Sequence, residues 1–165
     1  MKQLFLIRHA KSSWKQRGLP DHERPLSSRG RRQLATMGPV IRSAGALDKL
    51  VFCSTAVRAR LTLQGLLDPS VRPRTTFDQT LYTFDDRHLQ AWLALREEDH
   101  ITIVGHNPAL EDFVDSLVPD GPGHLPTCSF LHIELPIQSW HDLDKKPGRL
   151  LRYDTPKRVR SQSTR

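Results

Sequence analysis

Short apolar runs alternate with helical patterns along most of the chain, and this alternation restricts the fold more than any other feature of the sequence. Three prominent runs lie at 4–7, 50–53 and 101–104, and each is long enough for one buried strand. Segments with apolar residues at helical spacing follow them, at 27–44, 54–67 and 107–117. Strands that alternate with helices are typical of a parallel sheet with helices on both of its faces.

The remaining segments extend this pattern and give the sheet its edges. Residues 75–82 are predicted to form a short strand, and Asp85 to Arg96 a helix. Residues 131–135 alternate between apolar and polar, which predicts a half-buried strand, and 148–153 can pair with it. Pro39 lies inside the first helical segment and predicts a kink or an earlier end. We therefore expect an α/β fold: a three-layer α/β/α sandwich whose mainly parallel sheet has an antiparallel edge.

The length of 165 residues suits one domain with a sizeable core. We expect a single domain over residues 1–157 and a basic, flexible tail over 158–165. No apolar stretch is long enough for the core of a signal peptide or for a membrane span, so we expect a cytoplasmic protein with no membrane partner. Cys53 and Cys128 have no CxxC spacing or paired framework, which fits a reducing compartment, and both are expected to be packing residues.

Residues with strong chemistry follow three of the predicted strands at the point where each strand ends. Arg8 and His9 end the first strand, Arg58 comes shortly after the second, and His106 and Asn107 follow the run at 101–104. In sheets of this kind, ligands bind beyond the carboxyl ends of the strands. Guanidinium groups match phosphate oxygens in pairs, and a neutral imidazole nitrogen can attack phosphorus. The sequence therefore predicts a phosphoryl site where these side chains meet.

Several stretches of the chain, taken together and in order, resemble the histidine phosphatase superfamily, the phosphoglycerate-mutase-like proteins. These stretches are LFLIRHAKSSW (4–14), DHERPLSSRGRRQ (21–33), CSTAVRARLT (53–62), YTFDDRHLQAWL (82–93) and IVGHNPALEDFV (103–114). The first is similar to the family's Arg-His-Gly signature, with Ala10 where glycine is commonest. The stretches PTCSFLHIEL, SWHDL and GRLLRYDTPK are similar to the short SixA-type branch, and the resemblance covers residues 1 to about 157.

The resemblance implies a role for each residue that matches the family's pattern. His9 matches the nucleophile that becomes phosphorylated, and Arg8 and Arg58 match the arginines that clamp the phosphoryl oxygens. His106 matches the second histidine, which donates to the phosphoryl group and stabilises charge in the transition state. Arg60, although it lies near Arg58, is expected to be a solvated surface residue.

The general acid is the least clearly marked of the expected groups. Larger members of the superfamily carry a glutamate after the third strand, and the corresponding stretch QTLYTFDD has none. Asp21, in the loop after His9, is the candidate, and a turn or cap beside Pro20 is the alternative. Asp85 and Asp86 are expected to cap the following helix.

Three other polar residues could donate to a phosphate, although each is also typical of a loop or a helix cap. They are Ser12, Ser13 and Asn107, and Asn107 is the one retained as a candidate for substrate binding. Four residues of types that bind metals could form a metal site, namely His9, Asp21, His22 and His106. The two arginines would repel a cation from that pocket, so we expect no metal and no cofactor.

These features predict a metal-independent phosphatase that works through a phosphohistidine intermediate. Residues 68–100 are too short for the large lid that resembling enzymes place over small phosphate esters. An open pocket suits a phosphorylated protein side chain, so phosphohistidine in a partner protein is the predicted substrate. A small phosphate ester is the alternative.

Two non-catalytic hypotheses belong to a different class of protein. The formal net charge of +7 suits acidic partners, including nucleic acid, but the sequence has no RNA-recognition signature, so a nucleic-acid partner is not expected. A degenerate member of the family could bind phosphoproteins without turnover. The intact set of Arg8, His9, Arg58 and His106 argues against that reading. The oligomeric state is left open.

Overall fold

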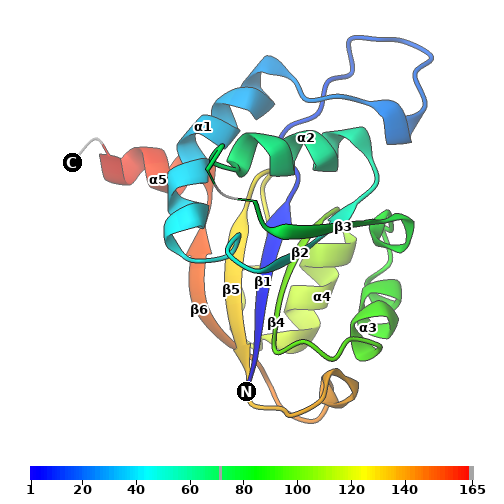
Figure 1. Ribbon diagram of the computed structural model, residues 1–165, viewed down its shortest axis with the longest axis vertical. Coiled ribbons are helices and arrows are strands. Elements are labelled where there is room, and N and C mark those ends of the chain that lie inside the picture. Colours follow the sequence, from blue (N-terminus) through cyan, green and yellow to red (C-terminus); the bar gives the residue numbers. More distant parts are fainter. Residues whose placement is uncertain (71, 164–165) are drawn as a thin grey trace.

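The computed structural model describes residues 1–70 and 72–163, and it has a sheet layer between two layers of helices (Figure 1). The strands are β1 (Lys2–Arg8), β2 (Leu50–Ser54), β3 (Arg74–Asp78), β4 (His100–Gly105), β5 (Phe130–Leu135) and β6 (Arg149–Asp154). The helices are α1 (Ser28–Ser43), α2 (Val57–Leu66), α3 (Asp86–Ala94), α4 (Ala109–Leu117) and α5 (Pro156–Ser163). Short 3-10 turns are η1 (Asp21–Glu23), η2 (Gln79–Leu81) and η3 (Trp140–Asp142).

The sheet has six strands in the order β3-β2-β4-β1-β5-β6. The four strands from β3 to β1 run parallel, whereas β5 pairs antiparallel with β1 and β6 pairs antiparallel with β5. This mixed sheet confirms the predicted α/β fold with an antiparallel edge. In the β1–β4 pair, Arg8 lies opposite Gly105, so the residues that follow these two strands, His9 and His106, leave the sheet side by side.

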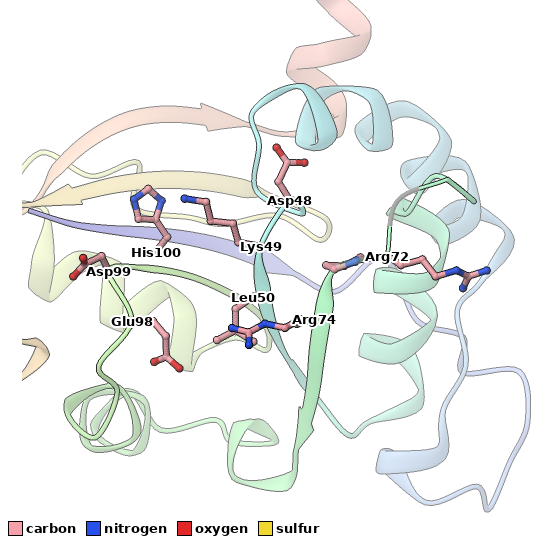
Figure 2. Close-up of a pocket in the computed structure, with 9 residues that line it drawn as sticks. Asp48, Lys49, Leu50, Arg72, Arg74, Glu98, Asp99 and His100 are labelled. Carbon is pink, nitrogen blue, oxygen red and sulfur yellow. The ribbon is translucent and has the colours of Figure 1, made fainter.

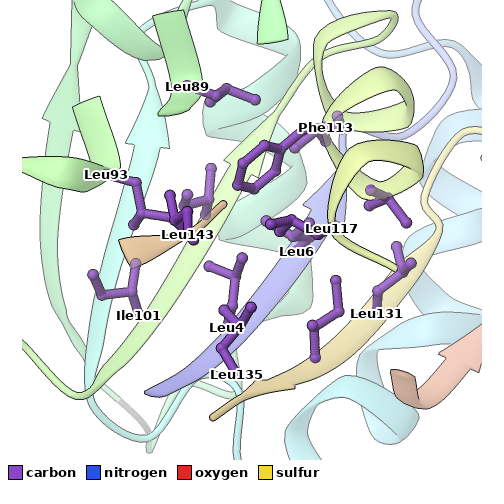
Figure 3. Packing of buried hydrophobic residues seen from close by; sticks show 14 of the residues in the cluster. Leu4, Leu6, Leu89, Leu93, Ile101, Phe113, Leu117, Leu131, Leu135 and Leu143 are labelled. Carbon is purple, nitrogen blue, oxygen red and sulfur yellow. The ribbon is translucent and has the colours of Figure 1, made fainter. Parts of the chain in front are cut away.

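Both faces of the sheet are covered, which explains why the first strand is apolar at successive positions. Leu4 and Leu6 pack into one buried cluster with the helices α3 and α4, and Figure 3 shows them beside Phe113 of α4. Phe5 and Ile7 point to the other face and pack into the cluster formed with α1 and α2. Because side chains alternate along a strand, β1 needs apolar residues for both cores.

The structure differs from the sequence-based expectations at two elements. The predicted strand at 75–82 ends at Asp78, whose carboxylate accepts a hydrogen bond from Thr80 N and starts the turn η2. The helix α1 continues past Pro39 to Ser43, so of the two outcomes predicted for this proline, a kink or an earlier end, the earlier end is wrong.

The C-terminal segment forms a helix that the sequence did not indicate. Residues 156–163 form α5, which Thr155 begins by accepting a hydrogen bond from Arg158 N, and Val159 packs against the α1–α2 core. Residues 164–165 of the expected tail lie outside the described residues, and the flexibility of 158–165 stays a prediction.

Two smaller expectations concern cysteines and membrane spans. Cys53 and Cys128 are buried and unpaired, as expected for packing residues. Across residues 1–70 and 72–163, none of the helices has the length and apolar character needed to span a bilayer.

Candidate active site

The carboxyl edge of the parallel strands gathers the residues that the sequence singled out. His9 follows β1, Arg58 lies in the first turn of α2, and His106 follows β4, while the loop after β1 extends over this end of the sheet (Figure 1). The rings of His9 and His106 have centroids 5.2 Å apart. The charges of Arg8 and Arg58 act on both rings, so the four side chains lie near one another.

His9 is held by its backbone and by one ring nitrogen. Its N–H donates to Gly105 O, and its own carbonyl accepts from Cys128 N, so both neighbouring segments fix its position. The ring nitrogen Nδ1 lies 2.7 Å from Ala10 O. A carbonyl oxygen can only accept, so Nδ1 carries the proton and Nε2 keeps its lone pair. This tautomer is the one that can act as a nucleophile.

The surroundings of His9 keep its ring neutral. Burial lowers the pKa of His9 to about 3, although the hydrogen bond to Ala10 works in the opposite direction. Three nearby cations add to the lowering, namely Arg58, Arg8 and Arg24. The ring is therefore unprotonated at neutral pH.

His106 is almost fully buried and is oriented by Ser54. Its Nε2 lies 2.7 Å from Ser54 Oγ, which also accepts a hydrogen bond from Ala56 N. Within the described residues the Ser54 hydroxyl has no other acceptor, so it donates to Nε2 and leaves the proton of His106 on Nδ1. Burial lowers the pKa of His106 to about 2, and the ring of His9 and the charge of Arg58 add to this effect. His106 therefore presents one N–H from a neutral ring.

Both guanidinium groups have part of their hydrogen-bonding capacity engaged. Arg8 donates from Nη1 to Leu125 O at 2.7 Å. Arg58 donates from Nη1 to Asp21 O at 2.7 Å and from Nη2 to the Asp21 carboxylate at 2.9 Å. Among the described residues, Nε of each arginine and Nδ1 of His106 are buried without a hydrogen-bond partner. Buried polar side-chain atoms without a partner are few in folded proteins, and three of the four in the described residues belong to this site, which fits an anion site.

Asp21 lies at this site, but its ionisation does not suit the predicted general acid. Burial raises the pKa of Asp21, and hydrogen bonds from Tyr82, Arg58 and Arg24 together with the charge of Arg58 outweigh it and bring the pKa down to about 2. The carboxyl is therefore ionised at neutral pH and has no proton to give. This ionised state does not favour the predicted role of Asp21 as general acid, which stays a prediction, and the sequence does not reveal the partners that cause it.

Asn107 precedes helix α4, binds to its first turn, and has no free amide hydrogen for a substrate. Its Nδ2 donates to Glu111 Oε2 and to Leu125 O, and its Oδ1 accepts from Glu111 N. Both amide hydrogens are thus used within the protein. Arg8 also donates to Leu125 O, so Asn107 and Arg8 contact the same segment, and the substrate-binding role of Asn107 stays a prediction that these bonds do not favour.

Sequence reasoning missed two aromatic residues beside the site. Tyr82 and Phe84 have ring centroids 5.4 and 5.7 Å from the ring of His106. Both belong to the stretch YTFDD, in which the sequence pattern assigned no role to either aromatic residue. Its aromatic residues were the available signal, but their contact with His106 depends on the fold. The hydrogen bond between Ser54 and His106 was also missed.

A wide hollow lies elsewhere in the structure. It measures about 570 Å³ and opens at the amino ends of β2, β3 and β4, opposite the site (Figure 2). Its charged lining residues carry both signs, as Figure 2 shows for Lys49, Arg74, Glu98 and Asp99. None of the predicted site residues lines it.

Solved structures of other proteins have a similar fold over most of this chain. A protein of Nakamurella multipartitia that carries the SixA name has a similar structure, with a TM-score of 0.78, 24% identity, and coverage of 94% of this chain and 96% of that one. The protein histidine phosphatase SixA complexed with tungstate gives a TM-score of 0.72 at 19% identity, covering 94% and 97% of the two chains. Both likenesses show the fold.

Sequence relatives extend over most of the chain. An uncharacterized chloroplastic protein of Arabidopsis thaliana is 29% identical over 153 residues, which cover 86% of this chain and 70% of that protein. An uncharacterized protein of Mycobacterium leprae is 28% identical over 166 residues, covering 92% and 100%. The family profile of the histidine phosphatase superfamily (branch 1) matches residues 4–98, more than half of the chain, and the chain therefore belongs to this superfamily.

Proposed function

We propose that this protein is a metal-independent phosphatase that removes the phosphoryl group from phosphohistidine in another protein by way of His9. One observation carries the proposal: Nδ1 of His9 is bonded to Ala10 O, which leaves the lone pair of Nε2 free, the ring of His106 lies beside it, and the charges of Arg8 and Arg58 act on it. A nucleophile among fixed positive donors is the arrangement that phosphoryl transfer requires. The tungstate bound by a protein of the same fold, a tetrahedral oxyanion like phosphate, supports it as well.

In the first step the phosphoryl group moves from the substrate to His9. The Nε2 lone pair of His9 forms a bond to phosphorus while the bond between phosphorus and the substrate's imidazole nitrogen breaks. The electron pair of the broken bond stays on that nitrogen. The substrate ring leaves as neutral imidazole when its other nitrogen carries a proton. Arg8, Arg58 and the Nδ1–H of His106 stabilise the charge on the phosphoryl oxygens.

In the second step water releases the phosphoryl group from His9. The water oxygen bonds to phosphorus, the bond to Nε2 breaks, and Nε2 regains its lone pair. Both water hydrogens leave with inorganic phosphate. The proton on Nδ1 stays on the ring throughout because Ala10 O holds it, so His9 is itself a neutral imidazole when it leaves phosphorus.

The charge state of Asp21 favours phosphohistidine over alkyl phosphates as the substrate. An alkoxide is a poor leaving group and needs a proton from an acid, whereas Asp21 is ionised. A protonated imidazole leaves without such an acid. Tyr82 is poorly suited to act as the acid in place of Asp21. The Tyr82 hydroxyl already donates its hydrogen to Asp21, and burial raises the pKa of Tyr82.

The experiment compares a phosphohistidine protein, an aryl phosphate and a sugar phosphate as substrates, each with and without a chelator. Wild type should hydrolyse the phosphohistidine protein best, the chelator should have no effect, and His9→Ala should be inactive but folded. His141→Ala is the matched control, since His141 is exposed in η3 far along the chain from the site. Full activity of His9→Ala, or a strong preference of wild type for the sugar phosphate, would contradict the proposal.

A further inference from the structure

An aromatic surface beside the site has no part in the steps above. The rings of Tyr82 and Phe84 pack edge to face with centroids 5.5 Å apart, and each also contacts the ring of His106. His22 packs edge-on against Tyr82 from another side at 4.8 Å. Phe84 nevertheless stays 46% exposed, so much of its ring is open next to the cationic site.

The segment that carries these two rings is fixed by hydrogen bonds. The Tyr82 hydroxyl donates to the Asp21 carboxylate at 2.6 Å. Between the rings, the hydroxyl of Thr83 accepts from Asp85 N and pairs with Nδ1 of His88 at 3.0 Å. A ring that is held in place before a ligand arrives loses little freedom on binding, so such a surface suits recognition.

We propose that Tyr82 and Phe84 form a platform of two rings that binds the imidazole of the phosphohistidine substrate. The Asp21 carboxylate then accepts a hydrogen bond from the far nitrogen of this imidazole, the nitrogen that is not bonded to phosphorus. This inference rests on the proposed function and assigns the part of the site that recognises the leaving group. Flat rings pack favourably edge to face or offset on aromatic side chains. The Asp21 side chain is 43% exposed and joined to the platform through Tyr82, so a ligand on the platform can reach it.

The Asp21 carboxylate can assist the reaction by stabilising the proton on the far nitrogen of the substrate ring. When phosphorus leaves the substrate ring, the electron pair stays on the near nitrogen, and the ring departs as neutral imidazole only if the far nitrogen holds its proton. An ionised carboxylate beside that N–H stabilises this protonated form. Asp21 would thus keep a proton on the substrate ring, as Ala10 O keeps a proton on the ring of His9. In both cases a bond between phosphorus and an imidazole nitrogen breaks, in the first step for the substrate and in the second step for His9.

The first test measures binding and does not depend on turnover. Phenylphosphonate and methylphosphonate are titrated calorimetrically into wild type, Phe84→Leu, Phe84→Tyr and Phe77→Leu. Phe77 is the matched control, because it is 44% exposed on β3 and packs under Arg60. Wild type, Phe84→Tyr and Phe77→Leu should prefer phenylphosphonate, and Phe84→Leu should lose about two- to tenfold of that preference. An unchanged preference in folded Phe84→Leu would overturn the platform.

The second test separates this inference from the proposed function. Wild type, Phe84→Leu and Asp21→Asn are compared on a phosphohistidine protein and on an aryl phosphate, whose ring has no N–H. Phe84→Leu should lower kcat/KM for both, and Asp21→Asn should lower the ratio of phosphohistidine to aryl activity. If wild type does not hydrolyse phosphohistidine, the proposed function fails and so does the imidazole assignment, whatever the phosphonates show. If wild type hydrolyses it and both variants match wild type, the function stands and the platform is wrong.

Discussion

Asp21 holds Arg58 through two hydrogen bonds, one to its backbone carbonyl at 2.7 Å and one to its carboxylate at 2.9 Å. The guanidinium proposed to clamp a phosphoryl group thus already has an anionic partner. A phosphate that reaches Arg58 meets the negative charge of Asp21, so binding reflects the balance between the attraction of the arginines and this repulsion.

The first prediction concerns this balance. Asp21→Asn should tighten the binding of inorganic phosphate by up to about fivefold, the usual value of an exposed ion pair, because it removes a like charge beside the anion. The inhibition constant for phosphate measures it. Glu23→Gln is the control, since Glu23 belongs to the same turn and pairs with His22 instead. Weaker phosphate binding in Asp21→Asn would mean that orienting Arg58 matters more than the repulsion.

The second prediction separates the two arginines of α2. Arg58→Ala should lower kcat/KM by about a hundredfold or more, because it removes fixed donors to the transferring group. Arg60→Ala should stay close to wild type, since Arg60 is exposed and packs against Phe77 with its charge 4.1 Å from that ring. Hydrolysis of an aryl phosphate measures both variants. If kcat/KM falls equally in the two variants, Arg58 has no specific role in binding the transferring group.

The third prediction concerns Ser54 as a positioning residue. Ser54→Ala removes the bond that fixes the His106 ring and should lower kcat/KM by about two- to tenfold, the value of one hydrogen bond. The same substitution in a His106→Gln background should have a much smaller effect, because the two side chains act as a pair. A double-mutant cycle measures this coupling. Additive losses would contradict the role given to Ser54.

The fourth prediction is the pH dependence of stability. The pKa values of His9 and His106 lie at about 3 and about 2 in the folded protein, below the ordinary value of 6.5. Between pH 6.5 and these values the unfolded chain binds more protons, so the free energy of unfolding must fall as the pH is lowered. Each histidine contributes a slope of about 1.4 kcal/mol per pH unit where only its unfolded form is protonated.

Urea denaturation at pH 7, 6, 5 and 4 measures this slope. His9→Asn should make it shallower, because asparagine can still donate to Ala10 O but does not titrate. Asp21 contributes little above pH 5, since its pKa of about 2 and its ordinary value of 3.8 both lie more than one unit below that pH, so the slope between pH 7 and pH 5 is the one compared. A slope unchanged by His9→Asn would show that the ring is not held neutral.

The fifth prediction concerns the packing of α1 against the loop after His9. A Cβ at Gly30 would come within 2.2 Å of Lys11 O, a backbone atom that cannot move freely. Gly30→Ala should therefore cost about 1–3 kcal/mol of stability, the usual range for overpacking. At Gly38 of the same helix, a Cβ meets only the end of the Arg42 side chain at 2.8 Å. Gly38→Ala should stay within about 1 kcal/mol of wild type, and thermal unfolding compares the two.

The sequence alone predicted the fold and the residues at the strand ends with good accuracy. Hydrophobic periodicity is local, so the runs at 4–7 and 101–104 and the helices between them could be recognised without a structure. In a parallel sheet the carboxyl ends of the strands share one edge, which is why His9 and His106 could be expected to meet. The cap at Asp85 follows the same local logic, and the structure confirms it.

Helix α5 shows where local patterns are insufficient. The segment 158–163 is polar and basic, and its sequence offers no long apolar stripe. Its helix is stabilised by contact with α1 and by the packing of Val159, which only the folded core provides. Most helical stability in proteins comes from such tertiary packing.

What the sequence by itself determined is which residues reach the edge of the sheet: Arg8, His9, Arg58 and His106. Only the tertiary structure decided their chemical states. Asp21 is ionised because Tyr82, distant from it in sequence, and two arginines donate to it, and His9 is neutral because the fold buries it. Ionisation depends on solvation and on partners drawn from distant segments, and no pattern of neighbouring residues contains that information.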